Sequence, residues 1–223
     1  TKDWTSADHF PNIDTLYSCR NTRTSTIIAG EFEDYSLTFG NFTVYNNYTT
    51  RTDVVIASYN DDGTWNWVKS FGGNSSDGVG HKQPKCNSEG DFLIQLTGSG
   101  KLEIGNNSYL SYGYDTSLGY RVLVAFDEYG YVKWVKNSSI GSYVDSNQEF
   151  IYTKSNELLY KFDWSGNQTW SRDMFQIEYT CGLYTHNLST FYLTENESLV
   201  FTEPCVEGQM SIENQSSSSY DNY

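Results

Sequence analysis

The strongest constraint on the fold is a β-hairpin pattern that occurs three times along the chain. Residues 120–136 alternate in the period of two that is typical of strands, and the turn residues Asp127–Gly130 interrupt them. Asp and Gly favour turns because Asp can hydrogen-bond nearby backbone and Gly tolerates a positive φ. Residues 59–67 and 162–170 repeat the order aromatic, Asn or Asp, two residues, Gly, three residues, Trp. The sequence therefore predicts three hairpins of one design, with matching, largely buried side chains at Trp67, Trp134 and Trp170.

These hairpins belong to longer modules. Residues 37–41 of module one (27–71) recur as residues 102–106 of module two (92–136), 65 residues further on. The turn glycines Gly63 and Gly130 are 67 residues apart, so the two modules differ by a two-residue insertion. Module three (150–170) lacks the long middle loop, and module four (190–201) lacks a closing Trp. No long amphipathic helical period is present, which predicts an all-β chain.

Such modules resemble the blades of β-propellers. Module three resembles the blade repeat of pyrroloquinoline-quinone-like propellers, and modules one and two resemble the SBBP β-propeller repeats of secreted and surface proteins. The resemblance covers residues 19–202 and implies a small propeller of about four blades over residues 1–206. It implies that an N-terminal strand closes the last blade, which makes Trp4, Trp67, Trp134 and Trp170 equivalent core positions. Two open sheets or a sandwich are the alternative architecture.

The four cysteines predict disulfides rather than a metal site. None forms a C-x-x-C pair, and His9, His81 and His186 do not have zinc spacing. Four cysteines allow three pairings. Their positions relative to the module strands favour the pairs Cys19–Cys86 and Cys181–Cys205.

The glycosylation sequon Asn-x-Ser/Thr indicates an extracellular location. About four sequons are expected by chance from the Ser and Thr content, and the chain has nine. The sites are Asn41, Asn47, Asn74, Asn106, Asn137, Asn167, Asn187, Asn196 and Asn214. With the even cysteine count, they predict a secreted or cell-surface protein that carries covalent N-linked glycans. The start at Thr1, without an apolar leader, is expected of a processed form or a trimmed chain.

Charge and hydropathy narrow the partners. The net charge of −14 disfavours nucleic acid and anionic membranes as partners. No apolar run approaches the roughly 20 residues that span a bilayer, so no membrane insertion is predicted.

The sequence contains no motif that predicts catalysis, a cofactor or a metal. The Asp-rich turns lack the alternating ligands of a calcium loop, and no nucleophile elbow, P-loop or dinucleotide fingerprint occurs. The leading interpretation is therefore a non-enzymatic extracellular structural protein that assembles with copies of itself into a filament or array. The Ser-rich tail, residues 207–223, is the segment expected to contact a neighbouring copy.

Two other functions fit the sequence less well. Tyr/Asn/Ser-rich loops suit hydrogen bonding and stacking on sugars, so a lectin-like propeller that binds carbohydrate is the alternative. The tyrosines concerned are Tyr45, Tyr48, Tyr109, Tyr112 and Tyr114. A glycoside-processing enzyme comes third, because three unrepeated carboxylates cannot be identified around a channel.

Overall fold

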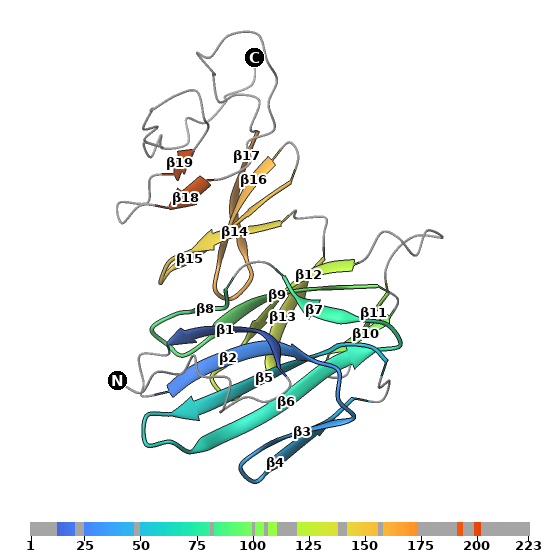
Figure 1. The fold of residues 1–223 in the computed structure, drawn as a ribbon. Coiled ribbons are helices and arrows are strands. Elements are labelled where there is room, and N and C mark those ends of the chain that lie inside the picture. Colours follow the sequence, from blue (N-terminus) through green and yellow to red (C-terminus); the bar gives the residue numbers. More distant parts are fainter. Residues whose placement is uncertain are drawn as a thin grey trace, which may run out of the picture.

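The protein consists of several antiparallel β-sheets. The computed structural model describes residues 13–20, 25–46, 50–80, 83–99, 101–104, 107–110, 120–137, 142–155, 158–173, 191–193 and 199–201. These residues contain strands and turns but no helix, which confirms the predicted all-β class. Figure 1 shows the sheets of the three modules following one another from the bottom of the view to the top. The strands within this part of the chain do not close into a barrel or a ring, so the number of blades stays a prediction.

The first sheet contains module one and one hairpin of module two. Its order is β1 (Asp14–Arg20), β2 (Ser25–Phe32), β5 (Asp53–Asn60), β6 (Trp65–Gly73), β10 (Lys101–Ile104) and β11 (Asn107–Leu110). Strand β6 pairs with β10 through Leu102 opposite Gly73 and Glu103 opposite Gly72. A hairpin of module two, which comes about 30 residues later in the sequence, therefore pairs with the last strand of module one.

The remaining strands form two further sheets and two separate hairpins. The second sheet has the order β13 (Val132–Lys136), β12 (Tyr120–Phe126), β9 (Phe92–Gly98) and β7 (Asp77–Val79), with β8 (Lys85–Cys86) also paired to β9. The third has the order β14 (Ser142–Ser146), β15 (Phe150–Lys154), β16 (Leu158–Asp163) and β17 (Gln168–Asp173). The two hairpins are β3 (Ser36–Phe39) with β4 (Phe42–Tyr45), and β18 (Phe191–Leu193) with β19 (Leu199–Phe201).

The sheets stack because their central strands are apolar on both faces. In β12, Val122, Val124 and Phe126 join a core cluster with residues of the first sheet such as Ile56. The alternating residues Leu123 and Ala125 join a different cluster with Ile151, Phe162 and Trp164 of module three. A strand that is buried on both faces needs this continuous apolar run. The second sheet is therefore the central layer between modules one and three.

The outer face of the first sheet is covered by the β3–β4 hairpin. Leu37, Phe39 and Val44 from the hairpin pack in one cluster with Phe32 and Val55 of the sheet. The sequence counterpart of this hairpin, β10–β11, places Leu102 and Ile104 in the core between the first and second sheets. The β10–β11 hairpin therefore lies on the side of module two that faces module one, and the β3–β4 hairpin lies on the side of module one that faces away from module two.

Candidate functional site

The three predicted hairpins have the same backbone geometry. In each turn, the residue after the aromatic accepts a hydrogen bond from the turn glycine, as in Asp127 with Gly130 at 2.9 Å. Gly63, Gly130 and Gly166 all have a positive φ, of 96°, 72° and 86°. Each hairpin also has a register shift of one residue at the same place, directly after the residue pair that contains Ser58, Ala125 or Lys161. Those three residues are paired with the tryptophans in matching register: Trp67, Trp134 and Trp170.

The tryptophans of modules one and two make the same contact with the turn of the following module. The indole N–H of Trp67 donates to the carbonyl oxygen of Glu128 at 3.0 Å. The indole N–H of Trp134 donates to the carbonyl oxygen of Trp164, also at 3.0 Å. Glu128 and Trp164 occupy equivalent positions, directly after the turn Asp. The sequence predicted the register of these side chains, but the side chains are partly buried because their N–H groups reach turns at the surface.

The turn glycines make this contact possible. A Cβ atom on Gly130 would lie 2.9 Å from the Trp67 ring, and one on Gly166 would lie 2.9 Å from the Trp134 ring. Real Cβ atoms do not approach a ring so closely, and a positive φ also disfavours other residues. Glycine therefore serves two purposes here: it forms the turn, and it allows the indole of the preceding module to lie against the backbone.

A lysine two residues after each of these tryptophans completes the contact. The Lys69 ammonium donates to the carbonyl oxygens of Tyr129 and Gly130 at 2.9 and 2.8 Å, and lies 3.7 Å from the centre of the Tyr131 ring. The Lys136 ammonium lies 4.6 Å from the centre of the Phe162 ring. Burial lowers the pKa of both lysines, and the nearby turn carboxylates, Asp127 and Asp163 respectively, oppose that shift.

We call this arrangement the Trp-Lys joint: a Trp-x-Lys strand of one module on the Asp-x-x-Gly turn of the next. It occurs twice in the described chain. Trp67 and Lys69 contact turn 127–130, and Trp134 contacts turn 163–166 while Lys136 lies over the ring of Phe162, directly before that turn. The hairpin pattern in the sequence indicated the tryptophans and the turns but not the lysines. Their spacing from each Trp was the signal that could have identified them.

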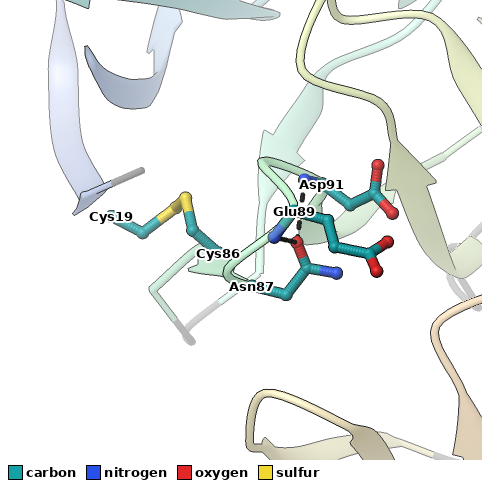
Figure 2. The surroundings of a disulfide bond; sticks show 5 residues. All are labelled: Cys19, Cys86, Asn87, Glu89 and Asp91. Carbon is teal, nitrogen blue, oxygen red and sulfur yellow. Dashed lines mark hydrogen bonds between the residues drawn. A yellow bond between two sulfur atoms is a disulfide. The ribbon is translucent and has the colours of Figure 1, made fainter. Parts of the chain in front are cut away.

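A disulfide ties the first sheet to the second. Cys19 in β1 is bonded to Cys86 in β8, with the two Cα atoms 5.8 Å apart. This confirms one of the two favoured pairs; Cys181 and Cys205 lie outside the described residues. Figure 2 shows Cys86 next to Asn87, whose side-chain oxygen accepts the backbone N–H groups of Glu89 and Asp91. The bond therefore enters the second sheet beside a rigid turn.

That turn is a further copy of the repeated one, and sequence reasoning missed it. Asn87 donates its backbone N–H to Asp91 at 2.9 Å, and Gly90 has φ 97°. The signal was Asn-x-x-Gly, but Phe92 and not a Trp strand follows it. The Asp91 carboxylate forms an ion pair with Lys133 of β13, which links the turn to the closing strand of the same sheet.

Two buried carboxyl groups, those of Asp53 and Asp77, lie beside Gly72 and Gly73 at the end of β6. Asp53 is only 6% exposed, and its Oδ1 has no hydrogen-bond partner among the described residues. Burial, and secondarily the charge of Asp77, raise the pKa of Asp53 from 3.8 to about 7. Asp77 accepts the backbone N–H of Gly73 at 2.8 Å. The Asp53 carboxyl also contacts the space where a side chain at Gly72 would begin, so this position requires glycine.

Four of the predicted glycosylation sites can be placed. Asn41, Asn74, Asn137 and Asn167 are all exposed. Asn167 also donates its side-chain amide to Asp163 at 3.0 Å, within the turn of module three. The other sites lie outside the described residues: Asn47, Asn106, Asn187, Asn196 and Asn214. The same holds for Trp4 and for the tail, residues 207–223.

Other classes of site were searched for in the described part of the chain. It contains no group of three or more His, Cys, Asp or Glu residues that could hold a metal ion. None of its segments forms a helix that is long and apolar enough to cross a membrane. Compared with known proteins, the sequence matches no family model and no curated protein.

Proposed function

We propose that this chain is a non-enzymatic, N-glycosylated extracellular structural protein that assembles with copies of itself. The observation that carries the proposal is the Trp-Lys joint, which repeats between modules one and two and between modules two and three. The most distinctive residues of the sequence, its Trp, Lys and turn Gly residues, are used there to hold modules together. A contact that a protein makes repeatedly within one chain is suited to extension between chains.

The proposed architecture is a small propeller of about four blades, with the N-terminal strand closing the last. The repeated hairpins and their common spacing support it, as does the stacking of successive sheets through shared apolar layers. The Cys19–Cys86 disulfide and the exposed sequons support an oxidising, secretory environment. The tail, residues 207–223, remains part of the proposal as a segment that contacts a neighbouring copy.

The test uses native material. Intact mass spectrometry before and after enzymatic deglycosylation should show a loss of glycan mass, and peptide mapping should place glycans at exposed sites such as Asn41 and Asn74. Electron microscopy of the same sample should show filaments or an ordered array. Native protein that carries no glycan and stays monomeric at high concentration would rule the proposal out.

Carbohydrate binding is the second candidate function, and exposed aromatic residues favour it. Tyr35 and Tyr45 lie on the outside of the β3–β4 hairpin, 62% and 55% exposed, with their ring centres 5.8 Å apart. Exposed tyrosines can stack on sugar rings and hydrogen-bond their hydroxyls. A glycan array, followed by calorimetry with the Tyr45→Ala variant, separates the two functions. A lectin loses sugar binding in that variant, whereas a purely structural protein binds no glycan in either form.

A further inference from the structure

The backbone of strand β3 carries hydrogen-bonding groups that point away from its hairpin. Asn46 donates its backbone N–H to the Tyr35 carbonyl oxygen across the hairpin, at 2.9 Å. Hydrogen-bonded and non-hydrogen-bonded pairs alternate along an antiparallel ladder, so Ser36 and Thr38 belong to non-hydrogen-bonded pairs with β4. Their N–H and C=O groups therefore point to the outer edge of β3. Among the strands that the structure describes, β3 pairs with β4 alone.

The equivalent edge of module two is paired. Strand β10 is the sequence counterpart of β3, and Glu103 is the counterpart of Thr38. On strand β6, Gly72 pairs with Glu103 and Gly73 pairs with Leu102. An edge of this design therefore binds an antiparallel strand elsewhere in the same chain.

Strand β3 lacks three features that commonly prevent an exposed edge from pairing. Such edges are blocked by charged residues, by proline or by a β-bulge. The sequence of β3, Ser-Leu-Thr-Phe, contains neither a charge nor a proline, and its register with β4 is continuous. The strand is four residues long, so it offers a short edge to a partner strand of similar length.

The charge around β3 favours a second copy of the chain as its partner. The chain has a net charge of −14, so two copies repel each other where their charged surfaces meet. Residues 35–50, which contain the β3–β4 hairpin, include no charged residue. This segment is therefore a place where two acidic copies can meet without bringing carboxylates together.

Strand β3 is also complementary to itself. When two copies lie antiparallel around a two-fold axis at Leu37, Ser36 of each copy lies opposite Thr38 of the other. Both residues present outward N–H and C=O groups, so the two Ser36–Thr38 pairs can form four hydrogen bonds. The charged residue nearest to β3 is Asp34, which lies opposite Gly40 of the other copy in this register and not opposite a carboxylate.

The side chains of the hairpin are suited to contact with another protein surface. Tyr35, Phe42 and Tyr45 are 62%, 36% and 55% exposed. Large apolar side chains that gather at one place on a surface commonly mark an interaction site. Figure 1 shows the hairpin at the bottom of the view, and its inner face packs on the first sheet. The hairpin is therefore held in place before a partner binds.

We propose that the β3 strands of two copies of this chain pair antiparallel around a two-fold axis at Leu37. The two hairpins then form one four-stranded sheet with the order β4–β3–β3–β4, and we call this contact the edge dimer. The inference rests on the self-assembly in the proposed function and assigns one of its interfaces. A two-fold contact uses the same surface on both copies and stops at a dimer, so a filament needs a second contact, which the proposed function assigns to the tail.

Two substitutions of Thr38 test the backbone contact. Thr38→Pro removes the outward N–H of β3, which forms no hydrogen bond within the hairpin. Thr38→Val is the matched control, because it also loses the hydroxyl contact with Thr43, at 3.1 Å, but keeps the N–H. Neither change alters the sequon at Asn41.

Sedimentation equilibrium of the full chain measures the dissociation constant of the dimer. Thr38→Pro should raise it about ten- to a hundredfold, because two hydrogen bonds are lost in each dimer. Thr38→Val should dimerise like wild type. Circular dichroism and thermal melting check that both variants are folded.

Cysteine cross-linking tests the register without a proline. Ser36→Cys in one copy and Thr38→Cys in the other lie in a hydrogen-bonded pair, with Cα atoms about 5.5 Å apart, within the range of a disulfide. The same residue of two copies lies on a diagonal, about 7–8 Å apart, which is too far without backbone movement. Under mild oxidation, a mixture of the two variants should form mixed disulfide dimers, and either variant alone should form few. Cross-links in the single variants that equal those in the mixture would contradict this register.

The outcomes separate the edge dimer from the proposed function. If wild type assembles and Thr38→Pro assembles equally well, the edge dimer is overturned and the structural function stands. If wild type stays monomeric at high concentration, both are overturned. If wild type is monomeric but dimerises through β3 after deletion of residues 1–12, the chain's own N-terminal segment occupies this edge, which also overturns binding of a second copy.

Discussion

The β3–β4 and β10–β11 hairpins share one sequence pattern but lie in two different environments. Both contain Leu-x-apolar-Gly-Asn, but β10–β11 packs between the first and second sheets, whereas β3–β4 covers the face of the first sheet that is turned away from the second. Strand β10 pairs with β6, the strand that carries Trp67 and Lys69. Strand β3 has no second partner strand among the described residues. The difference shows that the pattern specifies a hairpin and its inward face, while a neighbouring module specifies whether its edge is used.

The disulfide between the first and second sheets is expected to have the largest effect on stability. Cys19 and Cys86 are 67 residues apart in the sequence, and a bond that closes a loop of this length stabilises the folded state by about 4 kcal/mol in the chain-entropy account. The Cys19→Ser/Cys86→Ser double variant should lose about that much free energy of unfolding in a denaturant titration. An unchanged unfolding midpoint would show that the apolar layer alone holds the first and second sheets together.

The buried Asp53, which lies beside Gly72 at the end of β6, makes the stability of the folded protein depend on pH. In the unfolded chain Asp53 releases its proton near pH 3.8, and in the folded chain its pKa is about 7. Because the folded state binds the extra proton between these values, its stability falls as pH rises from about 4 to 7 and falls no further above that. The full difference amounts to at most about 4 kcal/mol.

The Asp53→Asn variant isolates this contribution. Its unfolding free energy, subtracted from that of wild type at each pH, removes the effect of all other titrating groups. The difference should change between pH 4 and 7 and favour the variant above pH 7. A difference curve that is flat over this range would mean that the Asp53 carboxyl is already ionised at low pH in the folded protein.

Removing the indole at the joint should cost slightly less. We expect Trp67→Ala to lower the free energy of unfolding by about 3 kcal/mol, at the low end for a large aromatic side chain because Trp67 is only partly buried. Trp67→Phe keeps much of the ring contact but loses the hydrogen bond to Glu128, and should cost about 1 kcal/mol. Equal losses in the two variants would show that the hydrogen bond, and not packing, holds the turn.

Substitutions of the turn glycines should have the smallest effect on stability, and they compare the turn that Trp67 covers with the equivalent turn of module one. Gly130→Ala and Gly63→Ala both place a Cβ at a positive φ, which costs about 1–2 kcal/mol. Only Gly130→Ala also meets a tryptophan ring, so it should be the more destabilising of the two in the isolated protein. Equal stability of the two variants would show that the Trp67 ring does not restrict the residue at position 130.

Much of the local structure was predictable from the sequence. The hairpins, their turns, the matching register of Trp67, Trp134 and Trp170, and the absence of helices in the described chain all follow from period-two patterning and turn chemistry. One disulfide pair was also anticipated from its position between modules. The Lys69 and Lys136 contacts were not predictable, because a lysine on a strand is ordinarily solvated. Only the tertiary structure shows that Lys69 donates to the carbonyl oxygen of Gly130 and that Lys136 lies over the Phe162 ring.

The chain by itself determined which segments become strands, where they turn and which faces are apolar, because these properties depend on residues close together in the sequence. Only the tertiary structure decided that β6 pairs with β10, that Trp67 donates to Glu128, and that Asp53 is buried near Asp77. These contacts join groups on different strands, and in the first two cases different modules. A strand edge, an indole N–H and a carboxyl group can each accept many partners, and the stacking of the sheets selects one of them.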